Sequence, residues 1–106
     1  MMGIGTDIVQ ISRVSLKDSF LRGVLSPNEL TLFSHEADQA SFVAGRFAAK
    51  EAFLKALGTG LSGAKMNEID VVYEEGGRPV ILFQGKRYPV SIAHDGGYAI
   101  AVALVE

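Results

Sequence analysis

The chain has 106 residues, of which 48% are apolar and 21% charged, with ten basic and twelve acidic side chains. This length predicts a single domain over residues 1–106, and the net charge of −2 argues against a broad nucleic-acid-binding surface. The absence of cysteine excludes disulfides, thiol nucleophiles and cysteine-ligated metals. Because so small a domain cannot easily hide so many apolar residues, we expect part of its surface to pair with other copies of the chain.

No segment has the pattern of a signal peptide or a membrane span. Residues 1–9 lack the basic residues with which a signal peptide begins. The longest apolar run, 98–105, is eight residues long, whereas a spanning helix needs about 20. We therefore expect a soluble, cytoplasmic protein that binds neither a membrane nor nucleic acid.

The first part of the chain predicts a strand and a short helix. Residues 3–11 are rich in β-branched side chains, which favour strands. Ser12 can accept a hydrogen bond from the first turn of a helix. We expect that helix to run for about three turns and to end near Gly23.

Two further helices are predicted by their capping residues. Ser26 and Glu29 have the spacing of a capping box, with a proline at the first helical position between them. Asp38 predicts the N-cap of the third and longest helix, which ends where Leu57 meets Gly58. That helix is rich in alanine, so another element can approach its backbone closely.

The second half of the chain predicts strands. Four apolar segments are separated by short glycine-containing turns, and short connections imply antiparallel pairing. The predicted strands are 69–73, 79–83, 88–94 and 98–105, with turns at 75–78, 84–86 and 95–97. We therefore expect an α+β fold: an N-terminal strand, three helices, and an antiparallel meander packed on the long helix.

Asp7 is unusual because it lies in the middle of an apolar strand. Burial of a carboxylate without a partner is costly. The sequence therefore leaves two interpretations. The side chain lies on the solvent face or caps a nearby backbone group, or it is a metal ligand or an acid–base group.

Glu51 and Lys55 lie four residues apart on the long helix and share one of its faces. The simpler interpretation is a surface ion pair that stabilises the helix. Phe47 lies one turn earlier on the same face, which favours partial burial. A carboxylate and an ammonium on such a face can hold a metal ion and a phosphate side by side.

A glycine loop and a histidine are weaker signals. Gly58, Thr59 and Gly60 follow the long helix, and glycines let backbone amides approach phosphate oxygens; Gly58 also serves as an ordinary helix stop. His94 ends a strand at a tight turn, where it bonds local backbone or donates to an anion. The basic residues that can help hold a phosphate at this loop are Arg46, Lys50 and Lys55.

Four segments together resemble one known family. They are GTDI at 5–8, FVAGRFAAKEAFLKALGTG at 42–60, GRP at 77–79 and VSIAHDGGYA at 90–99. In this combination the chain resembles holo-[acyl-carrier-protein] synthases, the small, single-domain type of 4′-phosphopantetheinyl transferase. The resemblance covers essentially the whole chain, and the long helix carries most of its specificity.

The resemblance implies a reaction and its partners. The 4′-phosphopantetheine arm of coenzyme A moves to a serine of apo-acyl carrier protein, giving holo-acyl carrier protein and 3′,5′-ADP. The cofactor is Mg²⁺, with Mn²⁺ as an alternative. The resemblance also implies a homotrimer with active sites between neighbouring subunits.

The resemblance assigns roles to particular residues. Asp7 and Glu51 would bind the metal, and Glu51 and Lys55 would be catalytic. Arg46 and His94 match contacts to the 3′-phosphate of coenzyme A. The other residues expected to bind coenzyme A are Lys50, the Gly58-Thr59-Gly60 loop beside the pyrophosphate, and Gly77, Arg78 and Pro79 near the adenine. The residues expected to contact the carrier protein are Arg13, Lys17, Phe20 and Arg22.

The chain departs from the family pattern in two places. It is short around the first two helices, where relatives are basic, and Asp18 lies among its few basic residues. Ala93 and Asp95 flank His94 where relatives often carry hydroxyl residues, and an aspartate beside a phosphate is repulsive unless it turns away. Two alternatives therefore stand beside the leading interpretation: a transferase for carrier proteins of secondary metabolism, and a non-catalytic module that binds coenzyme A or a carrier protein.

Overall fold

The computed structural model describes residues 2–58 and 64–106, which contain three α-helices and a five-stranded antiparallel sheet of order β1-β5-β4-β3-β2. The α+β fold predicted from the sequence is confirmed. The strands are β1 (Gly3–Gln10), β2 (Asp70–Tyr73), β3 (Pro79–Phe83), β4 (Lys86–Asp95) and β5 (Tyr98–Val105). The helices are α1 (Asp18–Val24), α2 (Pro27–Phe33) and α3 (Gln39–Leu57), with the 3₁₀ turns η1 (Ile11–Arg13) and η3 (Met66–Glu68).

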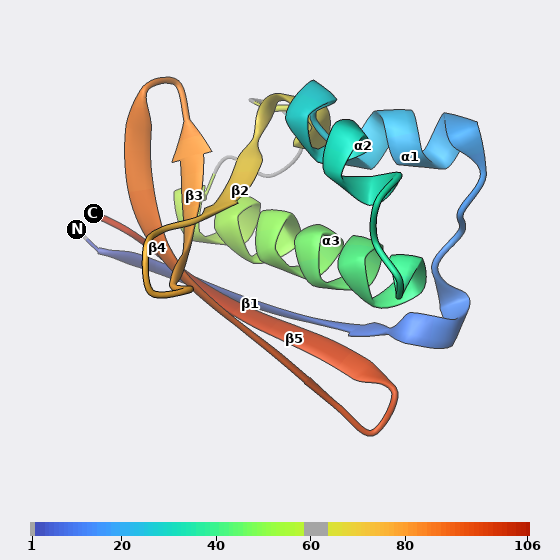
Figure 1. Cartoon of the computed structure of the whole chain (residues 1–106). Helices are drawn as coiled ribbons and strands as arrows, with labels where there is room; N and C mark the ends of the chain where they lie inside the picture. The colour runs from blue at the N-terminus through green and yellow to red at the C-terminus, as the bar shows by residue number, and fades with distance from the viewer. Residues whose placement is uncertain (1, 59–63) are drawn as a thin grey trace.

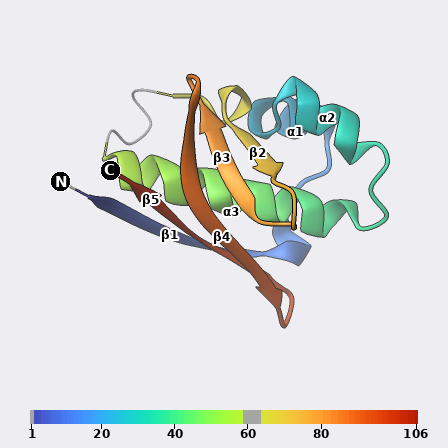
Figure 2. The same ribbon diagram turned by 60° about the vertical axis from the view of Figure 1, so that its left-hand side comes forward.

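Helix α3 occupies the middle of the molecule. Figure 1 shows β1 and β5 along one side of this helix and α1 and α2 along the other, and Figure 2 shows the sheet curving around it. One apolar cluster fills the space between α3 and the sheet, and a second lies between α1 and the first half of α3. In the described residues, no helix is long and apolar enough to cross a membrane.

The prediction of a helix from Ser12 to Gly23 is wrong. Ser12 lies in the 3₁₀ turn η1, the chain is then extended, and α1 begins only at Asp18. The backbone amide of Ile11 donates to the carbonyl of Gly97 at 2.8 Å, so the end of β1 is held to the β4–β5 turn and not released into a helix. Gly23 lies inside α1, which ends at Val24.

The capping predictions for the other two helices are confirmed. The Ser26 hydroxyl accepts from the Glu29 amide at 3.2 Å, and the Glu29 carboxylate accepts from the Ser26 amide at 3.0 Å. Asp38 accepts from the Ser41 amide at 3.1 Å, and Gly58 closes α3 with a left-handed φ of 75°. The strands match the prediction closely, except that β4 begins at Lys86 and not at residue 88.

The backbone of β1 lies directly on α3. A Cβ atom added at Gly3 or Gly5 would fall well inside van der Waals contact of the carbonyl oxygens of Ala56 and Ala52 respectively. Both alanines are buried, and their methyl groups leave room for the strand. This contact therefore requires small residues on both β1 and α3. It also determines how the later residues of β1 are placed relative to the helix.

Gly5→Ala is expected to destabilise the protein by about 1–3 kcal/mol or more, because the added methyl group has no space between β1 and α3. The measurement is the free energy of unfolding in urea. Gly23→Ala is the matched control: it adds the same methyl group where no atom lies within 4 Å and should stabilise α1 slightly. A Gly5→Ala variant as stable as the wild type would contradict the contact.

Candidate active site

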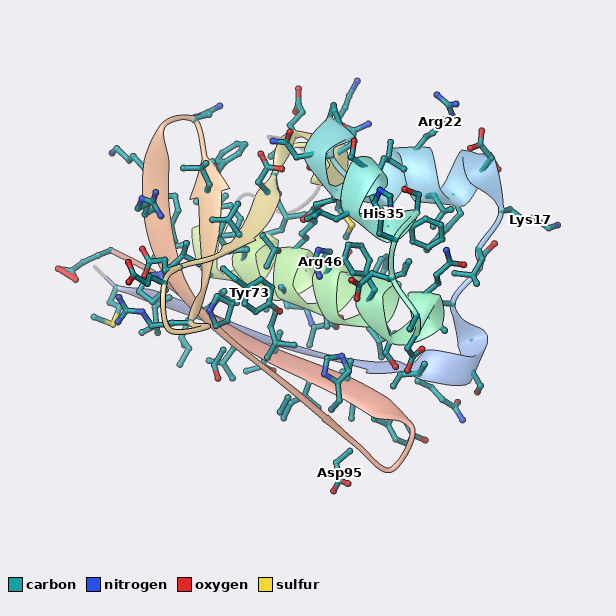
Figure 3. The ribbon with its side chains drawn as sticks, viewed as in Figure 1. Lys17, Arg22, His35, Arg46, Tyr73 and Asp95 are labelled. Carbon is teal, nitrogen blue, oxygen red and sulfur yellow. The ribbon has the colours of Figure 1, made fainter. Side chains whose placement is uncertain are left out.

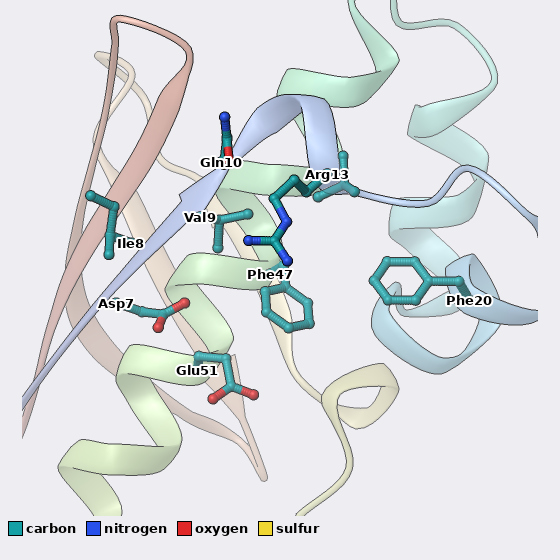
Figure 4. A pocket seen from close by; sticks show the side chains of 9 residues that line it. Asp7, Ile8, Val9, Gln10, Arg13, Phe20, Phe47 and Glu51 are labelled. Atoms are coloured by element: carbon teal, nitrogen blue, oxygen red, sulfur yellow. The ribbon is translucent and has the colours of Figure 1, made fainter.

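Asp7 and Glu51 point into the same pocket. Asp7 comes from β1 and Glu51 from α3, and the pocket between these elements has a volume of about 470 Å³. Figure 4 shows both carboxylates directed to its interior, with the Arg13 side chain above the Phe47 ring. The residues that line it are Asp7, Ile8, Val9, Gln10, Arg13, Val14, Phe20, Phe47 and Glu51.

Alternation along β1 explains why an aspartate stands in an apolar strand. Gly5 is buried against α3, and Asp7 lies on the same face two residues later, with a side chain only 17% exposed. The isoleucines on the other face, Ile4 and Ile8, are 67% and 64% exposed. In β1, therefore, the aspartate lies on the covered face and the isoleucines lie on the exposed face, the reverse of the usual arrangement in a sheet. The interpretation of Asp7 as a solvent-facing residue is wrong.

Lys55 contacts Asp7 and forms no ion pair with Glu51. Its ammonium donates to the carbonyl oxygen of Thr6 at 3.0 Å and lies 3.5 Å from the Asp7 carboxylate. The expected surface pair within the helix is therefore not formed. Lys55 instead lines a second pocket of about 350 Å³ that shares Asp7 and Ile8 with the first. The structure brings Asp7, Glu51 and Lys55 together around adjoining pockets.

Arg46 and His94 meet at a different pocket, of about 210 Å³. The His94 ring lies 3.3 Å from the Ser41 carbonyl oxygen, and a Cβ at Gly45 would come within 3.0 Å of its Nε2 atom. Gly45 is thus the position that lets the His94 ring lie against α3. Figure 3 shows Asp95 at the tip of the β4–β5 hairpin, pointing away from Arg46, so its carboxylate does not oppose an anion at this pocket.

Two acidic residues, Glu36 and Asp38, also line the Arg46–His94 pocket. Hydrogen bonds from the Ser41 hydroxyl and amide hold the pKa of the Asp38 carboxyl below its ordinary value. The carboxylate of Asp38 is therefore engaged in capping α3. Asp38 contributes its negative charge to the pocket, while its oxygens accept hydrogen bonds from Ser41 in the first turn of α3.

The expectation that Lys50 binds coenzyme A is wrong. Its side chain is fully buried, forms an ion pair with Glu29, and donates to the carbonyl oxygens of Val24 at 2.7 Å and Met66 at 3.0 Å. These partners occupy all three donors of the ammonium group. Burial lowers the pKa of Lys50, and the Glu29 carboxylate opposes this shift. Lys50 is a structural residue that ties α3 to α2 and to η3.

The segment at 77–79 adjoins the Arg46–His94 pocket through Tyr73, which lines that pocket and pairs with Pro79 across β2 and β3. Arg78 forms an ion pair with Glu74 at 2.9 Å, and Arg87 forms another with the same carboxylate at 3.1 Å. Arg78 and Pro79 line a pocket of about 240 Å³ that has no lining residue in common with the Asp7–Glu51 or Arg46–His94 pockets. Of the glycine loop, Gly58 is the C-cap of α3, and Thr59 and Gly60 lie outside the described residues.

The four residues expected to contact the carrier protein do not form one group. Arg13 and Phe20 line the Asp7–Glu51 pocket, where the Phe20 ring stacks on Phe47 with 6.0 Å between centroids. Lys17 and Arg22 extend outward at α1 (Figure 3), and Arg22 forms an ion pair with Asp18 at 2.7 Å. Arg13 and Phe20 are therefore placed at the mouth of the pocket, and Lys17 and Arg22 on its outer flank.

Sequence reasoning missed two residues next to Arg46. Glu29 was identified as a capping residue, yet its carboxylate is also the partner of Lys50 and lies 3.5 Å from the Arg46 Nε atom. The Tyr73 ring centroid lies 5.6 Å from the Arg46 guanidinium carbon. The only available signal was the position of Arg46 and Lys50, four residues apart on a helix with twelve buried residues. Buried cations of this kind require an anionic partner.

Lys50→Met is expected to destabilise the protein by about 3–5 kcal/mol, because the Glu29 carboxylate would remain buried without its main partner. Urea unfolding measures the loss, and Lys86→Met on the exposed start of β4 is the control. If unfolding were unchanged while the KM for coenzyme A rose, the original assignment of Lys50 would stand and the structural one would fail.

Comparison with protein-family models and with individual proteins points to the same family. The family model of the 4′-phosphopantetheinyl transferase superfamily matches residues 3–103. The chain is 42% identical to the holo-[acyl-carrier-protein] synthase of Staphylococcus carnosus, over 98% of this chain and 96% of that protein.

Solved structures agree with the sequence comparison. The holo-[acyl-carrier-protein] synthase of Neisseria meningitidis superimposes with a TM-score of 0.89 at 32% identity, over 98% of this chain and 97% of that one. A holo-(acyl-carrier-protein) synthase from Bacillus anthracis, solved in complex with CoA (3′,5′-ADP), has a TM-score of 0.85 at 34% identity, over 96% of this chain and 93% of that one.

Proposed function

Since the chain belongs to the 4′-phosphopantetheinyl transferase superfamily, we propose that it transfers the 4′-phosphopantetheine moiety of coenzyme A to a serine of apo-acyl carrier protein. The products are holo-acyl carrier protein and 3′,5′-ADP, and the substrate is the carrier protein of fatty acid synthesis. The observation that carries the proposal is the meeting of Asp7, Glu51 and Lys55 around adjoining pockets.

Asp7 and Glu51 fit a magnesium or manganese ion. Mg²⁺ is usually held by one or two carboxylates together with water and substrate phosphates. The described residues contain no group of three or more potential metal ligands, so two carboxylates leave coordination positions for phosphate oxygens. When bound, Mg²⁺ would neutralise the charge of the coenzyme A pyrophosphate.

Glu51 and Lys55 have complementary roles in this proposal. The serine oxygen attacks the β-phosphorus of coenzyme A, and the bond from that phosphorus to the bridging oxygen breaks to release 3′,5′-ADP. Glu51, or a water that it orients, accepts the serine proton. Lys55 reaches the same pocket edge and stabilises the negative charge that develops on the leaving phosphate.

The active site is proposed to be shared by two neighbouring subunits. Arg46 and Glu51 are five residues apart, which places them about 140° apart around α3. Their pockets share no lining residue. An active site formed by two subunits resolves this separation, because the Arg46–His94 pocket of one chain can face the carboxylates of the next. We take the number of three subunits from the family resemblance.

The outer face of β1 and β5 is the surface proposed to join the subunits. It is apolar although it is exposed in the single chain: Ile4 is 67%, Ile8 64% and Ile100 44% exposed. Ile8 and Ile100 lie opposite each other in the β1–β5 pairing. An exposed apolar sheet face of this kind is typical of a homo-oligomer interface, and its other side carries Asp7.

The carrier protein is proposed to dock beside α1. Arg13 and Phe20 line the mouth of the carboxylate pocket, where the phosphopantetheine arm would leave coenzyme A for the serine. Because Arg22 is paired with Asp18, Arg13 and Lys17 carry the basic charge offered to an acidic carrier protein. The surface beside α1 carries fewer basic charges than the resemblance to the family predicts, which favours docking by shape complementarity and apolar contact.

The proposed reaction is tested by the intact mass of apo-acyl carrier protein after incubation with the protein, coenzyme A and Mg²⁺. A mass gain of one phosphopantetheine, abolished by EDTA, is expected. Failure with apo-carrier proteins of both fatty acid synthesis and secondary metabolism would contradict the proposal and favour a module that only binds coenzyme A.

Glu51→Gln is expected to lower transfer by at least about 100-fold, because the amide neither accepts the serine proton nor carries the charge that binds the metal. Thermal unfolding should be unchanged, since the two side chains have the same shape. Glu68→Gln in η3 is the matched control for the substitution. An active Glu51→Gln variant would contradict the proposed role.

Ile4→Lys is expected to convert the trimer to a monomer and to abolish transfer, because a lysine cannot be buried at the apolar interface without a large penalty. Light scattering after size-exclusion chromatography gives the mass, and Leu32→Lys on α2 (50% exposed) is the control. A wild-type protein that is monomeric and active would contradict the shared active site.

A further inference from the structure

The Arg46 side chain is unusual because it is buried and incompletely hydrogen-bonded. It is 9% exposed, yet it lines the pocket that also holds His94. Within residues 2–58 and 64–106, its Nε atom has no hydrogen-bond partner. Buried polar groups are normally satisfied. Because the Nε atom is buried and faces Glu29, the part of Arg46 that a ligand can reach is the part that lines the pocket.

Carboxylates lie on two sides of Arg46. Glu36 and Asp38 line its pocket, and the oxygens of Asp38 are engaged in capping α3. Glu29 is the carboxylate behind it, with its Oε2 atom 3.5 Å from the Arg46 Nε atom. That carboxylate also forms the ion pair with Lys50 and accepts from the amide of Val71 at 2.9 Å. One carboxylate thus serves two buried cations, and the charge of Arg46 is only partly compensated from inside the protein.

Two aromatic rings fix the guanidinium in place. The guanidinium carbon lies 3.7 Å from the centroid of the Phe42 ring and 5.6 Å from that of the Tyr73 ring, both within the range of cation–π attraction. Phe42 is buried one turn before Arg46 on α3. Tyr73, at the end of β2, is 52% exposed, and Figure 3 shows it beside Arg46.

We propose that Tyr73 is a positioning residue for anion recognition: together with Phe42 it holds the Arg46 guanidinium toward the pocket, where it binds the 3′-phosphate of coenzyme A. This inference rests on the proposed function and adds to it a residue that sets the preference for coenzyme A over dephospho-coenzyme A. The aromatic ring is the part of Tyr73 that acts, because the attraction to Arg46 arises from its π face. Its hydroxyl group is not required.

The test is calorimetric titration of 3′,5′-ADP and of 5′-AMP, which lacks only the 3′-phosphate, into the wild type, Tyr73→Leu and Tyr73→Phe, each as the full chain. Tyr73→Leu should weaken the binding of 3′,5′-ADP about two- to fivefold, the size of a cation–π contact at an exposed site. Binding of 5′-AMP should be unchanged. Tyr73→Phe should bind both nucleotides like the wild type. Leu32→Ala, at a half-exposed side chain on α2 that does not line the Arg46–His94 pocket, is the control.

In the transfer reaction Tyr73→Leu should raise the KM for coenzyme A and leave kcat unchanged, because the ring affects binding of the 3′-phosphate and not the phosphorus that reacts. The KM for dephospho-coenzyme A should not change. A purely structural role of Tyr73 would affect both donors alike.

Three results would overturn the inference. Equal weakening of both nucleotides by Tyr73→Leu would mean that the ring contacts the base or ribose directly. No change would mean that Arg46 is positioned without it, and a Tyr73→Phe variant as weak as Tyr73→Leu would assign the effect to the hydroxyl. Failure of the wild type to bind either nucleotide would instead contradict the proposed function itself, and the inference with it.

Discussion

The structure depends on one contact, between the backbone of β1 and the backbone of α3. Gly3 and Gly5 on the strand face Ala56 and Ala52 on the helix, with no space for a larger side chain. This contact fixes the distance and the rotation between the two elements. Two residues beyond Gly5 the same face of the strand carries Asp7, and one residue before Ala52 the helix carries Glu51. The two carboxylates share a pocket because the small residues beside them allow the close approach.

The second constraint is the buried charge cluster around Glu29. Its carboxylate caps α2, accepts from the amide of Val71 and forms the ion pair with Lys50. The same group lies behind Arg46. These contacts of Glu29 hold the short helix α2 to α3 and β2. Because the same carboxylate serves Lys50, it neutralises the charge of Arg46 only in part. The stability of the fold and the proposed anion recognition therefore both depend on the Glu29 carboxylate.

The fold could be predicted from the sequence wherever a local signal decides the structure. The capping pairs of α2 and α3 and the glycine turns between the strands are signals of this kind, and the structure confirms them. The error between Ser12 and Gly23 arose because the contact of Ile11 with Gly97 joins residues far apart in the chain. Local propensity carries no information about such a contact.

The candidate site was predicted less evenly. Asp7, Glu51 and Lys55 could be singled out because charges interrupt apolar patterns, and Arg46 and His94 could be paired only through the family resemblance. Lys50 was misassigned because its buried partner, Glu29, lies 21 residues away in the chain. Tyr73 has no signal in the sequence, since an aromatic residue at a strand end is unremarkable until Arg46 is placed beside it.

The central claim is that Asp7 and Glu51 act on one metal ion, and a double-mutant cycle of Mn²⁺ binding tests it most directly. Mn²⁺ affinity is measured by electron paramagnetic resonance in the presence of coenzyme A for the wild type, Asp7→Asn, Glu51→Gln and the double variant. If both carboxylates hold the same ion, each single substitution should remove most of the binding, and the double variant should lose little more. Independent, additive losses, or Mn²⁺ binding that survives both substitutions, would contradict the account.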